Sequence, residues 1–151
     1  MIKFNYRLEP LLNIKTQKED LMKMKLAAEL KKLYIERQKL DILKHENKKQ
    51  ISDYSALITS RVSVNKIRDC NSYICRLRDI IEEKKKNINV IAENVDKIRG
   101  ELINESQERE TLEKLKERKL AAYREELSKE EQKLNDEMVS FRQNMVLAVE
   151  G

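Results

Sequence analysis

The chain has 151 residues, of which only two are Gly and one is Pro, while 39% are charged and 5% are aromatic. A β-sandwich or an α/β domain needs turn-forming residues at each connection, and this composition does not supply them. Apolar residues make up 40% of the chain but fall in stripes, which bury a seam between helices and not a core with pockets. The composition therefore predicts an all-α protein built from long helices.

Net charge is +5 but is spread unevenly along the chain. Residues 1–50 carry 13 basic and 7 acidic side chains, a net of +6, and residues 51–100 carry 10 and 7, a net of +3. Residues 101–151 carry 9 and 13, a net of −4. If the chain folds back on itself, the basic first part and the acidic last part attract each other modestly, and salt screens that attraction.

The first helix is expected over about residues 8–58. Pro10 suits the first helical turn, where its missing N–H loses no hydrogen bond. No helix breaker follows before about residue 58. An apolar stripe with the spacing of a heptad seam supports this helix and contains Leu26, Leu30, Leu33 and Leu40.

A turn is expected over about residues 59–72, where weak helix formers cluster. Ser63 is one candidate to cap a short helical segment running into Ile67, and Asn71 or Ser72 is the alternative cap.

The second helix is expected over about residues 73–147 and carries the more regular stripe. Its seam positions alternate in steps of three and four, and Lys84 is the one interruption. The apolar members are Ile74, Leu77, Ile81, Ile88, Ile91, Val95, Ile98 and Leu102. A repeat of this period indicates a left-handed supercoil with a partner helix.

Two unequal helices joined by a short turn predict one coiled-coil domain over residues 1–151, folded as an antiparallel two-helix hairpin. The longer second helix would run past the start of the first and leave the apolar residues 134–149 unpaired. An exposed apolar surface of this kind is a candidate contact site.

The sequence offers little for catalysis or for ligand binding. His45 is the only histidine, and Cys70 and Cys75 lack further ligands at zinc spacing. The two cysteines fall on different helical faces, so we expect free thiols. Gly100 and Gly151 stand alone and form no phosphate-binding loop. We therefore expect no enzyme activity, no metal, no cofactor and no small-molecule substrate. Without a signal peptide or an apolar span, a cytosolic protein is the default expectation.

Nucleic-acid binding is the alternative from another class. Basic clusters occur at residues 31–32, 48–49 and 84–86, but acidic residues interleave with them and the last third is acidic. Phosphate binding favours a continuous basic stripe. We therefore expect no nucleic-acid partner and favour docking to other proteins, a role that coiled coils commonly fill. Salt-dependent retention on DNA would instead support the alternative.

Both ends of the chain resemble the flagellar FliJ family. Residues 4–12 read FNYRLEPLL, similar to the family's opening F-x-[FY]-R-L-x-x-[VL]-L. Residues 112–119 (LEKLKERK), Tyr123 and residues 130–137 (EEQKLNDE) resemble its C-terminal signature of an E-K-L-x-E-[RK] block followed by E-Q-K-x-x-D-E. The two blocks occur in the family's order in a chain of family length.

The resemblance implies a stalk-like component of the flagellar type III export apparatus, at the cytoplasmic face of the membrane. Its paired ends would enter the hexameric export ATPase, and it would also contact the membrane protein of the export gate and export chaperones. The end residues implied are Phe4, Tyr6, Arg7, Leu8, Leu134, Met138, Phe141 and Met145. The gate patch implied is Tyr73, Leu77 and Ile80, for which packing beside the turn is the alternative. The corresponding stalk of a virulence-type secretion system remains a second candidate identity.

Overall fold

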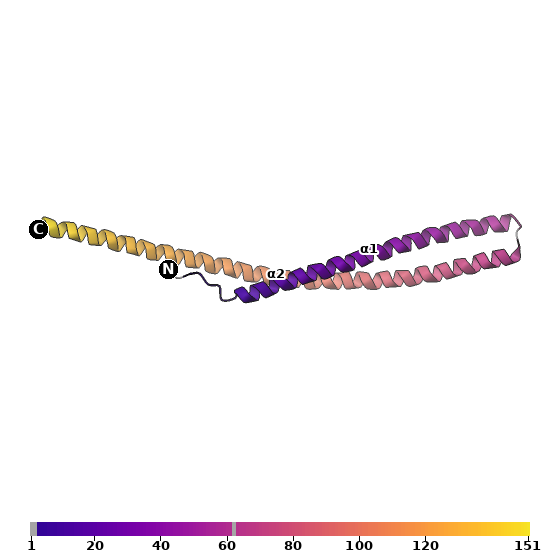
Figure 1. Cartoon of the computed structure of the whole chain (residues 1–151), viewed down its shortest axis with the longest axis horizontal. Helices are drawn as coiled ribbons and strands as arrows, with labels where there is room; N and C mark the ends of the chain where they lie inside the picture. The colour runs from indigo at the N-terminus through magenta and orange to yellow at the C-terminus, as the bar shows by residue number, and fades with distance from the viewer. Residues whose placement is uncertain (1–2, 62) are drawn as a thin grey trace. The chain divides into compact units, whose positions relative to one another are not determined.

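The protein consists of two α-helices in the computed structural model, which describes residues 3–61 and 63–151. Helix α1 spans Glu9–Thr59 and helix α2 spans Val64–Glu150 (Figure 1). The remaining described residues are an N-terminal lead, residues 3–8, the link between the helices and the final Gly151. This arrangement confirms the predicted all-α hairpin with a longer second helix.

Helix α1 begins within one residue of the predicted start. The Tyr6 carbonyl accepts a hydrogen bond from the Glu9 N–H, at 3.0 Å, and the Leu8 carbonyl accepts one from the Leu12 N–H, at 3.0 Å. Glu9 places a carboxylate in the first turn, where the helix dipole favours a negative charge. Pro10 lies in the same turn, as its fixed φ angle and missing N–H allow.

The turn is shorter than predicted, because α2 begins at Val64 and the range 59–72 was too wide. The Ser63 carbonyl accepts hydrogen bonds from the N–H groups of Lys66, at 3.1 Å, and Ile67, at 3.3 Å, so Ser63 precedes the first helical turn. Val62 lies outside the described residues. Arg61 has a φ of 51°, the left-handed conformation that commonly ends a helix.

Tertiary packing explains why residues 64–72 are helical despite weak helix formers. Ile67 and Cys70 are half-buried, and the next seam residue, Ile74, is buried. The Cys70 Sγ lies 3.9 Å from the Gln50 carbonyl of α1, to which it donates. Packing against α1 therefore outweighs local propensity, which differs by less than about 1 kcal/mol per residue among ordinary residues.

Contacts divide the chain into two units, and the predicted single domain over residues 1–151 stays a prediction. Unit 1 comprises Met1–Lys18 with Glu105–Gly151, and unit 2 comprises Glu19–Asn104. In unit 2 the core is a cluster from both helices in which Val95 is the least exposed residue, at 2%. Its buried members are Leu33, Leu40, Ile81, Ile88 and Val95, flanked by Leu26, Leu43, Ile91 and Ala92. The five buried members are all stripe residues that the heptad spacing selects.

The helices of unit 2 run antiparallel, and an ion pair fills the one polar position of the α2 stripe. Glu36 faces Lys84 and Gln50 faces Cys70, so the α2 partner moves backward as α1 advances. The Lys84 Nζ donates to the Glu36 Oε2 at 2.7 Å, and both side chains are shielded from solvent over most of their surface. This hydrogen bond from Lys84, followed by that from Lys39, lowers the pKa of Glu36 below its ordinary value of 4.5.

Gly100 provides a test of local helix stability. A Cβ built on Gly100 meets no atom within 4 Å, and the residue has no positive φ angle. We expect Gly100→Ala to raise the free energy of unfolding by about 0.8–1.0 kcal/mol, because Gly is the weaker helix former. Urea unfolding followed by circular dichroism measures the change. Ala121→Gly, at an exposed position of α2, is the matched control and should lower stability by a similar amount. No gain from Gly100→Ala, with the control behaving as expected, would contradict the prediction.

The ion pair in the unit 2 seam predicts a pH dependence. A carboxylate whose pKa is lowered by folding stabilises the folded state above its unfolded pKa, and that contribution disappears as pH falls through the folded value. Wild type should therefore melt at a higher temperature than Glu36→Gln at pH 7, and the difference should shrink as pH drops below 4.5. Glu82→Gln is the control, because in the described chain Glu82 pairs with Lys85 of its own helix and with no residue across the seam. An equal difference at pH 7 and pH 3 would contradict the assignment.

Candidate functional site: the lead, the tail and the turn-proximal patch

The N-terminal lead is fixed on α2 by its two aromatic residues. Tyr6 is only 4% exposed, and its hydroxyl donates to the Leu112 carbonyl at 3.0 Å. The Lys119 Nζ lies 5.9 Å from the centre of the Tyr6 ring, within cation–π range. The Phe4 ring centre lies 5.5 Å from that of Tyr123, with the ring planes tilted by 47°. The lead is therefore a packed part of unit 1.

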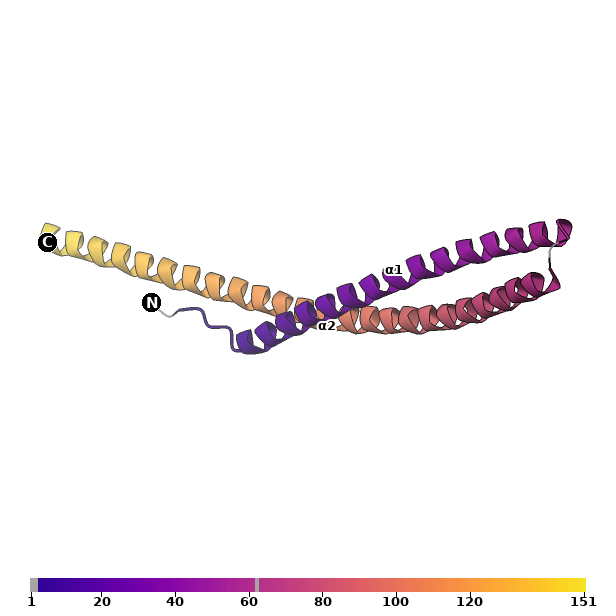
Figure 2. The ribbon, with the colours of Figure 1, turned by 45° about the vertical axis from the view of Figure 1, so that its right-hand side comes forward.

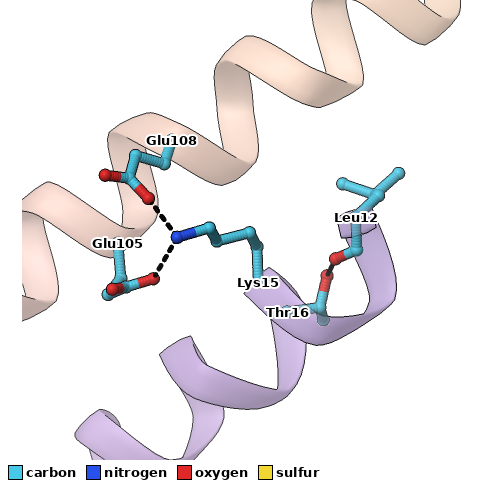
Figure 3. A network of polar contacts seen from close by, with 5 residues as sticks. All are labelled: Leu12, Lys15, Thr16, Glu105 and Glu108. Atoms are coloured by element: carbon cyan, nitrogen blue, oxygen red, sulfur yellow. Dashed lines mark hydrogen bonds and ion pairs between the residues drawn. The ribbon is translucent and has the colours of Figure 1, made fainter. Parts of the chain in front are cut away.

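Ion pairs hold the first turns of α1 against α2 in the same unit. The Lys116 Nζ lies 2.8 Å from the Glu9 Oε2. The Lys15 Nζ reaches Glu105, at 3.5 Å, and Glu108 (Figure 3). The hydrogen bond from Lys15 lowers the pKa of Glu108, and the same contact raises the pKa of Lys15. The Lys15 pairs join the basic first part of the chain to the acidic last part, whereas in the Glu9–Lys116 pair the acid comes from the first part.

The C-terminal tail, residues 128–150, is a helix with no covering partner in unit 1. Every residue of the tail is exposed, which confirms the expectation that residues 134–149 are unpaired. In Figure 2 this part of α2 continues past the lead to the C-terminus. Phe141 is 65% exposed, and a shallow groove along the helix is lined by Leu134, Glu137, Met138, Phe141, Arg142 and Met145. The tail therefore presents large apolar side chains to solvent.

The residues predicted at the chain ends divide into two groups. Phe4, Tyr6 and Leu8 are half-buried or buried in the lead, and Arg7 is exposed. Leu134, Met138, Phe141 and Met145 are exposed on the tail. The last aromatic contact of the lead is at Tyr123, and Leu134 follows roughly 16 Å farther along α2 at about 1.5 Å per residue. Unit 1 thus offers a packed lead and, beyond it, a bare apolar helix.

The turn-proximal patch, defined as Tyr73, Leu77 and Ile80, does not present all three side chains to solvent. Tyr73 is 39% exposed and Ile80 is 46% exposed, and their spacing of seven places them on one face of α2. Leu77 is 4% exposed and belongs to the seam stripe. For Leu77 the structure favours the packing alternative, whereas Tyr73 and Ile80 remain candidates for contact with a partner.

Unit 2 also brings together basic residues that are far apart in the sequence. A groove between α1 and α2 is lined by Asp41, Lys44, His45, Asn47, Lys48, Arg78, Ile81, Glu82 and Lys85. No sequence motif predicts this group, because its members come together only through the antiparallel register of the two helices. Two carboxylates lie among the cations, so the groove is of mixed charge.

The described residues contain neither a metal-binding cluster nor a membrane-spanning helix. No group of three or more His, Cys, Asp or Glu side chains is placed to hold a metal ion there. No helix in the described part of the chain is both long and apolar enough to cross a membrane. Cys70 and Cys75 are free thiols, as expected.

Comparison with known proteins identifies the family. The model of the family described as "Flagellar FliJ protein" matches residues 4–145, which include residues 4–8 of the lead, all of α1 and α2 as far as Met145. No curated protein matches the chain. No solved structure matches it. The family match covers nearly the whole sequence, and the chain therefore belongs to the FliJ family and is a component of the flagellar export apparatus.

Proposed function

We propose that this protein is a non-enzymatic stalk that inserts its terminal end, the lead and the tail, into the hexameric flagellar export ATPase. The observation that carries the proposal is the bare apolar tail, in which Met138, Phe141 and Met145 are exposed on a helix beyond the packed lead. An apolar face of this length is rarely left in water without a binding role.

The packing of unit 1 supports a role for both termini in one contact region. Tyr6 anchors the lead to α2, and the Lys15 and Lys116 ion pairs hold the start of α1 beside it. The beginning of the chain and its final helix are therefore presented together. Arg7, exposed in the lead, supplies a charged contact at the rim, and the tail supplies apolar contacts in a sleeve of the ring.

A second contact region is proposed for the export gate. Tyr73 and Ile80 offer an aromatic and an aliphatic side chain on one exposed face of α2, and Leu77 supports that face from within the seam. Contact with the gate would bring the protein to the cytoplasmic face of the cell membrane at the flagellar base. Export chaperones complete the proposed set of partners, and the resemblance to the family supports them.

The ATPase contact is tested with charges on the apolar tail. Phe141→Asp with Met145→Asp should weaken binding in a pull-down with the cognate ATPase by at least about 100-fold, since burying each large apolar side chain contributes about 1.5–3 kcal/mol. Stimulation of ATP hydrolysis should fall in parallel. The control, Ser140→Asp with Gln143→Asp, adds the same charge on the opposite helical face and should lose far less. Unchanged binding by the Phe141/Met145 variant would refute the stalk proposal.

The gate contact is tested with variants that distinguish the exposed residues of the patch, Tyr73 and Ile80, from the buried Leu77. Tyr73→Ala with Ile80→Ala should reduce binding to the cytoplasmic domain of the gate protein and leave the melting temperature nearly unchanged. Leu77→Ala should instead destabilise the hairpin by about 2–5 kcal/mol, because it leaves a cavity in the seam. Val90→Ala, at an exposed position of the same helix, is the control for both measurements. Full gate binding by the Tyr73/Ile80 variant would remove these residues from the contact.

A further inference from the structure

The tail carries a heptad spacing of its own beyond the part of α2 that packs on the lead and α1. In unit 1 the half-buried stripe of α2 includes Leu120, Tyr123 and Leu127. From Leu127 onward, steps of four and three select a heptad series of Leu127, Glu131, Leu134, Met138, Phe141, Met145 and Ala148. The step from Tyr123 to Leu127 is also four residues, so this series is shifted in phase from the packed stripe, and its members beyond Leu127 are all exposed. A repeat of this kind calls for a second helix.

The charges beside this seam indicate which helix fits. With Met138 and Met145 at position a and Phe141 at position d, Glu137 falls at position g and Arg142 at position e. In a parallel, in-register pair of identical helices, position g of one chain faces position e of the following heptad in the other. Glu137 of each copy then faces Arg142 of the other copy, so the twofold symmetry forms two ion pairs.

An antiparallel pair of tails lacks this complementarity. In an antiparallel pair, position g of one helix faces position g of the other, and position e faces position e. With the two tails aligned on this same seam, Glu137 lies beside Asn144 and Arg142 lies beside Asn135. Within the described chain, neither Glu137 nor Arg142 forms an ion pair, so both charges are available to a second copy. Charge complementarity at the flanks sets orientation in coiled coils, and here it favours the parallel arrangement.

We infer that the tail forms a parallel homodimeric coiled coil, in which a second copy of this chain covers the apolar stripe from Leu134 to Ala148. The seam is short, and Glu131 occupies one of its core positions, where two like charges would oppose each other. The association is therefore weak and reversible. The helix is already formed in the tail, so the dimer does not bear the nucleation penalty of an isolated peptide.

Dimerisation covers the same face that the proposed function assigns to the ATPase ring. A free dimer must then separate before the tail enters the ring, which keeps the apolar stripe out of water until its partner is met. This consequence rests on the proposed function, whereas the dimer itself does not depend on it.

The test is sedimentation equilibrium of the full-length chain with charge-exchanged variants. Wild type should show a concentration-dependent equilibrium between monomer and dimer. Glu137→Arg alone and Arg142→Glu alone should each raise the dimer dissociation constant roughly tenfold, because each places like charges opposite one another. The double variant Glu137→Arg with Arg142→Glu should restore wild-type association, since the pairs are reformed with reversed sign. High salt should reduce the differences between these variants.

Two further variants distinguish the effect of losing apolar packing in the seam from the effect of changing the net charge of the tail. Phe141→Asp with Met145→Asp should abolish the dimer, whereas Ser140→Asp with Gln143→Asp should leave it intact. A wild-type chain that stays monomeric at all concentrations would overturn the inference. A double charge exchange that dimerises no better than the single exchanges would also overturn it, because the helices would not be parallel. Neither result would alter the ATPase pull-down, so failure of the dimer and failure of the stalk are distinguishable.

Discussion

The seam between α1 and α2 buries aliphatic side chains that neither helix can cover alone. In unit 2, Val95 packs with Leu33 and Leu40 of the opposite helix, and the Glu36–Lys84 pair occupies the one polar position of the α2 stripe. In the described residues the apolar interior is this seam together with the packed lead, so helix stability depends mainly on that packing, and propensity is a smaller contribution. The antiparallel pairing also determines which surfaces are left uncovered, since α1 covers only the part of the α2 stripe that lies beside it.

The unequal lengths of the helices then determine where binding surfaces can lie. The lead and the first turns of α1 occupy α2 as far as Tyr123, where Phe4 makes its aromatic contact. Beyond Leu127 every residue of α2 is exposed, and unit 1 ends in a helix that presents large apolar side chains to solvent. The same few contacts that fix the lead thus define where the tail begins. A tail that binds itself when free and a ring when assembled would use one surface for both purposes, with α1 setting its boundary.

Much of this architecture could be predicted from spacing. The scarcity of Gly and Pro predicted long helices, and the heptad stripe predicted the buried residues of α2, including Ile81 and Ile88. The width of the turn was wrong because local propensity suggests a break near residues 64–72, whereas packing of Ile67 and Ile74 on α1 keeps the helix intact. Propensity is visible in a single sequence, but packing across the hairpin requires the register of the two helices.

The candidate sites were predicted unevenly for the same reason. Exposure of the tail followed from unequal helix lengths. The anchoring role of Tyr6, through its hydrogen bond to the Leu112 carbonyl, depends on a contact between distant residues and had no local signal. Leu77 shows the converse, since it matches the family position implied for the gate but its side chain is buried in the seam.

Backbone hydrogen exchange in the tail tests the central claim most directly. A helix without tertiary packing exchanges its amide hydrogens quickly, and burial in a partner slows that exchange. Exchange of residues 128–150 should slow markedly when the hexameric export ATPase is added to the full-length protein, while exchange of the unit 2 seam around Val95 stays unchanged. If the tail exchanges equally fast with and without the ATPase under conditions where the two proteins bind, the tail is not the stalk's contact surface.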